Sequence, residues 1–227
     1  MERLSVESKV LQKNDDYARA NRTLFEELKL AAVNFMSAPG AGKTSVLERI
    51  LPLLTPALRV AVVEGDLYTS LDAERIRAFG VPAHQITTGT CCHLDARMIS
   101  RALSEFSLSG GTDLLIIENV GNLVCPAEFD LGEHLRIMVY SVVEGAEKPQ
   151  KYPLMFRVAD AVLLNKTDLL PYAGVSLEEL TANVLKVNPT VPIFPVSCRT
   201  GDGFESWNAW FLNKVQEMRK EQAAVCA

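Results

Sequence analysis

The chain has 227 residues, of which 48% are hydrophobic and 22% are charged. That balance provides material for a core and excludes wholesale disorder, and the length suits one α/β domain with an extension. A net charge of -5 argues against a general affinity for nucleic acid. No apolar run reaches the roughly 18 residues that a membrane helix needs, and the charged first residues contain no secretory core.

The cysteine content points to a compartment. Five cysteines, an odd number in a chain of this length, do not form a disulfide framework. We therefore expect a cytoplasmic protein whose cysteines stay reduced. In that compartment a cysteine next to a histidine is interpreted first as part of a metal or redox site.

The predicted elements start with an amphipathic helical segment, one helix or two short ones, over Val6–Leu30. Short apolar runs then alternate with helical segments. The apolar runs are Ala31–Met36, Arg59–Val63, Asp113–Ile117, Arg136–Val143, Ala161–Leu164 and Val191–Val196. The helical segments are Ser45–Leu54, Ser70–Phe79, Leu94–Phe106, Ser176–Val187 and Phe204–Ala224. This alternation predicts a three-layer α/β fold, with a mainly parallel sheet between helices on both faces.

The character of the sequence changes once, near residue 30. We therefore divide the chain into an N-terminal helical extension, residues 1–30, and one α/β domain, residues 31–227. No internal repeat and no low-complexity linker suggests a further division.

A phosphate-binding loop follows the first apolar run. Ser37–Thr44, with the sequence SAPGAGKT, matches the P-loop motif except that Ser37 replaces the first glycine. Small residues let backbone N–H groups surround phosphate oxygens, and the helix that follows directs its positive dipole end at them. A plain glycine-rich turn is the alternative, but the position between a strand and a helix favours a P-loop. The predicted phosphate-binding residues are Pro39, Gly40, Ala41, Gly42, Lys43, Thr44 and Ser45.

The residues that would recognise the base of the nucleotide lie further along the chain. Asn165, Lys166 and Asp168 follow an apolar run, which places them at the carboxyl end of a strand, where α/β proteins bind ligands. A carboxylate accepts both donors on the Watson–Crick edge of guanine, and the Lys166 stem can cover the base. Alone, this motif is also consistent with a capped loop. Downstream of a P-loop it predicts a GTP site, completed by the loop Ser197, Cys198 and Arg199.

Two acidic residues end apolar strands near the predicted phosphates. Glu118 is expected to supply a carboxylate for magnesium, and Gly121 to let the backbone approach the γ phosphate. Asp66 either ligates magnesium or orients the attacking water. Lys43, Asp66 and Glu118 are the predicted catalytic residues, and Thr44, Asp66 and Glu118 the predicted magnesium ligands. No glutamine occupies an obvious water-positioning place, so we expect slow intrinsic hydrolysis.

A candidate transition-metal site comes from two separate segments. Cys92 and His93 precede a predicted helix, whose N-terminus favours a thiolate, and Cys125 lies a few residues beyond Gly121. Cys91 is a possible further ligand. Sulfur and nitrogen ligands suit nickel or zinc, and three ligands are fewer than the four of a closed structural zinc site. Either a second subunit completes the set or the site stays open to release its metal.

The other cysteines and histidines are assigned no metal. Cysteine is among the most buried residue types, so the cysteines could also belong to the core. Cys198 and Cys226 are interpreted as non-ligands for metal. His84 and His134 are interpreted as structural or surface histidines.

With these residues in place, the sequence resembles the HypB-type hydrogenase nickel-incorporation GTPases of the SIMIBI class. The resemblance runs from about Val33 to Phe211. The segments that carry it are Glu64–Asp66, Thr88–Gly89, Cys92–Ala96, Glu118–Pro126 and Lys148–Pro153, and Ser37 is also usual in that family.

The resemblance implies a P-loop GTPase that forms a GTP-dependent homodimer, binds nickel or zinc at Cys92, His93 and Cys125, and helps load nickel into [NiFe]-hydrogenase. The implied partners are a HypA-type zinc-containing nickel chaperone and the hydrogenase large subunit as client. Cys91 stands where the family usually has glycine, and the N-terminus has neither a Cys-rich nor a His-rich nickel-holding stretch. The helix before residue 30 is then either a docking element for the HypA-type partner or a helix packed on the domain.

The residues also suggest how the two sites communicate. Cys125 and the expected γ-phosphate contact share one loop, so GTP can change metal affinity, and linkage makes the effect reciprocal.

Three rival functions are a urease-type nickel GTPase, a non-catalytic nucleotide-binding module with structural zinc, and a small-molecule kinase. The sequence lacks the Cys-Pro-His motif of the urease-type nickel GTPases. It also shows no lid or acceptor site of the kind that a small-molecule kinase needs.

Overall fold

The computed structural model describes residues 6–68, 71–106, 108 and 111–225. Seven parallel strands form one sheet in the order β3-β2-β4-β1-β5-β6-β7. The strands are β1 (Ala31–Ser37), β2 (Val60–Asp66), β3 (Ala83–Thr87), β4 (Leu114–Glu118), β5 (Leu135–Ser141), β6 (Ala161–Asn165) and β7 (Ile193–Pro195). Because the strands are all parallel, the loops after β1, β2, β4 and β6 all begin at the same edge of the sheet.

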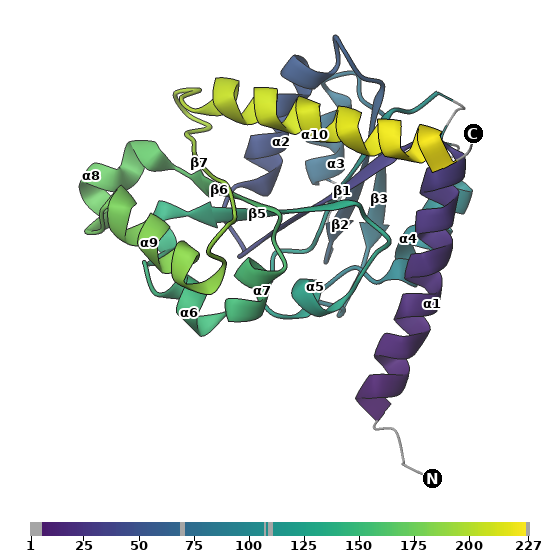
Figure 1. Cartoon of the computed structure of the whole chain (residues 1–227), viewed down its shortest axis with the longest axis horizontal. Helices are drawn as coiled ribbons and strands as arrows, with labels where there is room; N and C mark the ends of the chain where they lie inside the picture. The colour runs from purple at the N-terminus through teal and green to yellow at the C-terminus, as the bar shows by residue number, and fades with distance from the viewer. Residues whose placement is uncertain (1–5, 69–70, 107, 109–110, 226–227) are drawn as a thin grey trace.

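Helices cover both faces of the sheet, which gives three layers (Figure 1). One face carries α2 (Lys43–Leu54), α3 (Leu71–Arg77) and α10 (Phe204–Val225). The opposite face carries α1 (Val6–Glu27), α4 (Ala96–Glu105) and α9 (Leu177–Val187) beside a group of shorter helices. The shorter elements are α5 (Cys125–Glu128), η1 (Val142–Glu144), α6 (Lys148–Lys151), α7 (Pro153–Arg157), η2 (Thr167–Leu169) and α8 (Leu170–Ala173).

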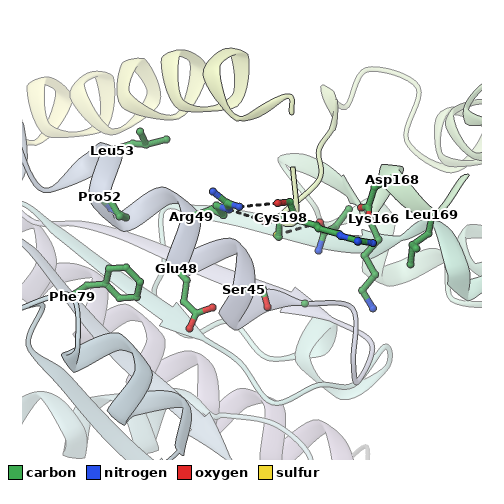
Figure 2. Close-up of a pocket in the computed structure, with 13 residues that line it drawn as sticks. Ser45, Glu48, Arg49, Pro52, Leu53, Phe79, Lys166, Asp168, Leu169 and Cys198 are labelled. Atoms are coloured by element: carbon green, nitrogen blue, oxygen red, sulfur yellow. Dashed lines mark hydrogen bonds between the residues drawn. The ribbon is translucent and has the colours of Figure 1, made fainter. Parts of the chain in front are cut away.

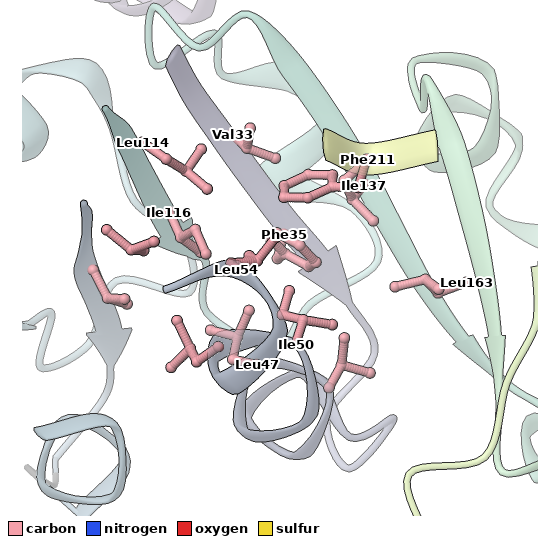
Figure 3. Close-up of a cluster of buried hydrophobic side chains, with 14 of the residues drawn as sticks. Val33, Phe35, Leu47, Ile50, Leu54, Leu114, Ile116, Ile137, Leu163 and Phe211 are labelled. Atoms are coloured by element: carbon pink, nitrogen blue, oxygen red, sulfur yellow. The ribbon is translucent and has the colours of Figure 1, made fainter. Parts of the chain in front are cut away.

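The largest core lies between the sheet and the helices α2 and α10. Alternate side chains of β1, β4 and β5 point into it and meet the apolar stripe of α2, as Figure 3 shows. Phe35 of β1 packs edge-on against Phe211 of α10, with ring centroids 6.2 Å apart. Burying each such large side chain contributes about 1.5–3 kcal/mol, so this core holds the phosphate loop and α2 rigidly against β1.

The predicted fold class is confirmed, with one strand more than expected. The predicted apolar runs correspond to six strands, but β3 was not predicted because its residues, AHQIT, are half polar. As an edge strand, β3 has only β2 beside it, so it needs no continuous apolar run. The segment Val6–Leu30 forms one helix rather than two, and the strand expected over Arg136–Val143 ends at Ser141, where a 3₁₀ turn begins.

The N-terminal helix α1 is packed on the α/β domain. Phe25 is fully buried in the same core cluster as Leu103 of α4, and Gln222 of α10 donates to the Leu30 carbonyl oxygen at 3.1 Å. In Figure 1 the N-terminal half of α1 projects beyond the body of the molecule. Among the described residues, no helix has the length and apolar character needed to cross a bilayer.

Candidate nucleotide and metal sites

The phosphate loop connects the end of β1 to the start of α2. Gly42 precedes α2 with a φ of 100°, and a Cβ there would come within 2.7 Å of the Asn165 side-chain nitrogen. This position therefore requires glycine for its backbone conformation and for close packing. Lys43 donates to the Ser37 hydroxyl at 2.9 Å, so the serine that replaces the first glycine of the motif holds the lysine.

Two buried carboxyl groups lie behind the loop. Glu64 of β2 and Glu118 of β4 are paired in register on neighbouring strands and are 2% and 4% exposed. Burial raises the pKa of both, and the Glu118 charge raises the pKa of Glu64 further, while the Lys43 ammonium lowers it. One oxygen of each carboxyl group has no hydrogen-bond partner. A cation or a proton is needed to balance this pair.

The side chains beside the phosphate loop offer hard oxygen donors. Thr44 donates its hydroxyl to Glu118 Oε1 at 2.8 Å, and Asp66 lines the same cavity of about 510 Å³. Magnesium prefers oxygen ligands of this kind, and the unpartnered Glu118 oxygen is consistent with it. The residues expected from the sequence to hold magnesium, Thr44, Asp66 and Glu118, therefore lie together.

The base-binding loops pack directly on the phosphate loop. Asn165 donates to the Ala41 carbonyl oxygen at 2.9 Å, and Lys166 donates to the Gly40 carbonyl oxygen at 2.7 Å. Ser197 donates its hydroxyl to an Asp168 carboxylate oxygen at 2.7 Å, which orients that carboxylate. Lys166 adopts a left-handed backbone with a φ of 64°. The chain segments that sequence analysis linked to GTP thus form one continuous surface.

A cavity of about 970 Å³ opens between α2 and these loops. Figure 2 shows Lys166, Asp168 and Cys198 on one side of it and Arg49 of α2 between them and Phe79. Arg49 donates to the Cys198 and Arg199 carbonyl oxygens at 2.6 and 3.0 Å. Sequence analysis missed Arg49, because a charged residue on an amphipathic helix carries no motif.

The candidate metal ligands come together in space, although they come from two loops. One ligand atom each from Cys92, His93 and Cys125 lie within 4.8 Å of one another, and the two sulfurs are 3.2 Å apart. Cys91 Sγ lies 3.7 Å from His93 Nδ1 but is not part of this group. Two thiols and an imidazole form a soft donor set that suits nickel or zinc.

The surroundings of the ligands differ from the sequence expectation in one respect. Asp95, not a thiolate, caps α4, by accepting from the Met98 backbone N–H at 2.7 Å. Burial raises the pKa of Cys125, and the neighbouring Cys92 raises it further, so a metal must displace a proton there. Burial lowers the pKa of His93, which keeps the imidazole neutral and able to coordinate. Its ring packs 4.0 Å from the ring of Phe129.

A buried asparagine joins the metal loops to the nucleotide side. Asn119, directly after Glu118, accepts from the backbone N–H groups of Leu94 and Val120 at 3.0 and 2.9 Å. No motif in the sequence assigns Asn119 a role of its own. Its place directly after a buried strand is the signal that singles it out.

Two glycines bring the loops into direct contact. A Cβ on Gly121 would lie 2.9 Å from the Pro39 Cα of the phosphate loop, and a Cβ on Gly65 would lie 2.8 Å from the Leu94 side chain. No side chain therefore separates the phosphate loop from the loop that leads to Cys125. Small movements at the phosphates have a short physical path to the metal ligands.

The remaining histidines and cysteines lie outside the Cys92–His93–Cys125 group. His84 lies 3.9 Å from Glu105, and His134 is a packed residue whose Nδ1 accepts from the Ala32 backbone N–H at 3.0 Å. The Cys198 thiol contacts Asn165 at 3.3 Å, on the base side of the site. Cys226 lies outside the described residues.

Residues 31–195 match the model of the CobW/HypB/UreG nucleotide-binding domain. The chain is 53% identical over 208 residues to the hydrogenase maturation factor HypB of Azotobacter vinelandii, covering 91% of this chain and 68% of that protein. The chain belongs to the HypB family. The hydrogenase/urease maturation factor HypB of Helicobacter pylori is 41% identical over 217 residues, which cover 94% of this chain and 89% of that protein.

Solved HypB structures share the fold. HypB from Archaeoglobus fulgidus superposes with a TM-score of 0.84 at 40% identity, covering 90% of this chain and 100% of that chain. HypB from Helicobacter pylori, determined in complex with nickel, also gives a TM-score of 0.84, at 41% identity over 90% of this chain and 96% of that chain. The seven-stranded sheet and its surrounding helices are therefore those of the HypB family, and the predicted family membership is confirmed.

Proposed function

We propose that this protein is a GTP-hydrolysing metallochaperone that delivers nickel during hydrogenase maturation. The observation that carries the proposal is the Cys92–His93–Cys125 group. Its member Cys125 lies four residues after Gly121, which packs directly on the phosphate loop. The names of its relatives support hydrogenase as the client, and the nickel complex of a HypB protein supports nickel as the cargo.

In the nucleotide half of the proposal, GTP binds along the phosphate loop. Backbone N–H groups of Gly40–Thr44 and the Lys43 ammonium contact the phosphates, and Asp168, held by Ser197, accepts the two donors of guanine. Thr44, Asp66 and Glu118 would hold magnesium, which would neutralise charge on the phosphates. Asp66 lies at the cavity wall, where it can orient a water. Catalysis then depends mainly on positioning and charge, which suits slow turnover.

In the metal half, Cys92, His93 and Cys125 bind nickel, and zinc competes for the same donors. Cys92 is exposed, and three ligands leave a coordination position open. An open site lets a metal enter and leave, whereas a closed four-ligand site holds it. A second copy of the chain in a GTP-dependent homodimer would place a further donor at this exposed position. The HypA-type partner and the hydrogenase large subunit remain proposals that rest on the family.

The two halves are coupled through the loop from Asn119 to Cys125. A γ phosphate at Gly121 changes the position of this loop, and the same loop carries Cys125 and, through Asn119, holds Leu94. Nickel affinity therefore differs between the GDP-bound and GTP-bound states, and nickel changes GTP affinity by the same factor. The cytosol is the proposed compartment, which the four free cysteines among the described residues support.

Direct metal titration tests this function. Nickel is added to the metal-free protein with GDP and then with a non-hydrolysable GTP analogue, in wild type, Cys92→Ala and Cys198→Ala. We expect tight binding that depends on Cys92, differs between nucleotides and is unaffected in Cys198→Ala, whose thiol lies at the base loop. Stoichiometric zinc that survives chelators, without GTP hydrolysis, would instead indicate a structural zinc module.

A further inference from the structure

The buried stripe of α1 contains two polar residues where apolar ones are usual. Asn14, Ala18, Asn21 and Phe25 follow one another at spacings of four, three and four, and all are buried. Asn14 and Asn21 are only 6% and 2% exposed. Burying a side-chain amide is unfavourable unless its hydrogen bonds are satisfied, so the partners of these two residues show what the helix holds.

Both asparagines bond to the start of α4, directly behind the first metal loop. Asn14 Oδ1 accepts from the Ala96 backbone N–H at 2.9 Å, and Asn21 Nδ2 donates to the Ala96 carbonyl oxygen at 2.8 Å. Ala96 is three residues after His93. The peptide groups on either side of Ala96 are thus fixed from one helix.

The same two side chains also bond to the segment that follows the second metal loop. Asn14 Nδ2 donates to the Asp130 carbonyl oxygen at 2.8 Å, and Asn21 Nδ2 donates to the Leu131 carbonyl oxygen at 2.9 Å. These carbonyls come five and six residues after Cys125. The helix approaches this segment very closely, because a Cβ on Gly132 would lie 2.6 Å from the Ala18 carbonyl oxygen.

We propose that α1 sets the nickel affinity of the Cys92–His93–Cys125 site by holding its two loops at a fixed separation through Asn14 and Asn21. The two loops otherwise meet through a buried bond from the Leu94 backbone N–H to Asn119 Oδ1. Nearer the surface they meet through the Cys92–Cys125 contact, the His93–Phe129 ring contact and a 3.3 Å bond from Asn122 to the Cys92 carbonyl oxygen. The bonds of Asn21 and the Asn14–Ala96 bond are also buried, and they tie both loops to one helix.

This inference rests on the proposed nickel site but not on GTP hydrolysis. Asn14 and Asn21 are positioning residues, since they contact the backbone near the ligands and not the metal. Residues that hydrogen-bond directly to metal ligands change metal affinity by roughly 10- to 100-fold when they are replaced. Asn14 and Asn21 act one step further away, through the backbone, so the low end of that range applies. Asn14→Leu and Asn21→Leu are therefore expected to weaken nickel binding about 10-fold.

The matched control is Gln222→Leu. Gln222 is also a buried amide, 5% exposed, that donates to a backbone carbonyl oxygen, but its partners Leu30 and His134 lie outside both metal loops. Asn14→Asp is a nearly isosteric second variant. Its carboxylate still accepts from the Ala96 N–H, but it places an acceptor oxygen against the Asp130 carbonyl oxygen in a buried position.

The experiment uses the full chain with nickel sulfate and no nucleotide. Nickel affinity is measured by chelator competition, the thiolate-to-nickel charge-transfer band by absorption, and folding by the thermal midpoint. We expect weaker binding and a changed band in the asparagine variants, with a lowered midpoint but unchanged nickel binding in Gln222→Leu. If Asn21→Leu does not fold, Asn14→Leu and Asn14→Asp carry the test.

Two results would overturn the inference. One is wild-type affinity and an unchanged band in folded asparagine variants. The other is equal weakening in Gln222→Leu, which would make the effect one of general stability. Failure of the nickel proposal itself looks different, because wild type would then bind no nickel or would bind it equally well after Cys92→Ala.

Discussion

The nucleotide region and the metal region are built differently, although one loop connects them. Around the phosphates, Lys43 and Thr44 are buried side chains that each bond to another residue, and the loop backbone is braced by Asn165 and Lys166. The metal ligands lie on two short loops, with Cys92 exposed and with a sulfur–sulfur contact between them.

This difference indicates which of the two sites has its binding conformation before its ligand arrives. The phosphate loop already has the conformation that backbone N–H groups need to surround a phosphate, so a nucleotide binds without large rearrangement. The metal loops depend on a buried bond between them, from the Leu94 N–H to Asn119, and on buried bonds from two residues of α1, Asn14 and Asn21. A rigid site suits a nucleotide that drives a change, and an adjustable site suits a metal that must be transferred.

The largest expected effect separates the two regions. Lys43→Ala removes the ammonium from the phosphate loop, and charge-assisted bonds of this kind contribute about 1.5–3 kcal/mol, so GTP affinity should fall roughly 10- to 150-fold. Nickel affinity without nucleotide should not change. Fluorescent-nucleotide titration and nickel competition measure both, with the exposed Lys214→Ala as control. A parallel loss of nickel binding would show that the two regions are not separable.

A smaller effect tests the contact between the regions. Gly121→Ala places a methyl group 2.9 Å from the Pro39 Cα, so the two loops must move apart. Overpacking of this kind costs about 1–3 kcal/mol, and we expect roughly 10-fold weaker binding of a GTP analogue and a reduced nucleotide effect on nickel affinity. Gly174→Ala controls for a general loss of stability, since its φ of 67° strains an alanine while its Cβ would meet nothing within 4 Å. Wild-type coupling in Gly121→Ala would rule out this contact as the connection.

The smallest effect concerns stability, remote from both sites. Burial lowers the pKa of His134 below its ordinary value of 6.5, and Arg22 lowers it further. As pH falls below that value, the unfolded chain takes up the proton first, so the free energy of unfolding decreases. Urea unfolding at pH values from 7.5 to about 5 should therefore show a shallower pH slope in His134→Gln than in wild type or His84→Gln. Equal slopes would contradict the assignment.

Most of the fold could be predicted from the sequence because buried parallel strands are apolar throughout. β4, with the sequence LLIIE, is recognisable without any partner, since helices cover both of its faces. The edge strand β3 is not, because three of its five residues are polar and only the sheet order shows that it lies at an edge. The short helices α5 to α8 have four or five residues each, too few for a helical period.

The residues of the site also differ in how far they could be predicted from the sequence. The P-loop residues and the base motif are local, so their spacing along the chain reflects their spacing in space. The pairing of Glu64 with Glu118 depends on β2 lying beside β4, which no local pattern specifies. Asn14 and Asn21 have partners 75 to 116 residues away, so on the sequence they look like polar residues of an exposed helix.

The wide separation of α1 from its partners also has a consequence for synthesis. The helix leaves the ribosome before Ala96, Asp130 and Leu131 exist, and at bacterial or eukaryotic elongation rates that interval lasts roughly 5–25 s. During that interval the stripe that includes Ala18 and Phe25 has no surface of its own chain to cover it. The nascent protein therefore exposes its N-terminal helix to other proteins before its metal loops have formed.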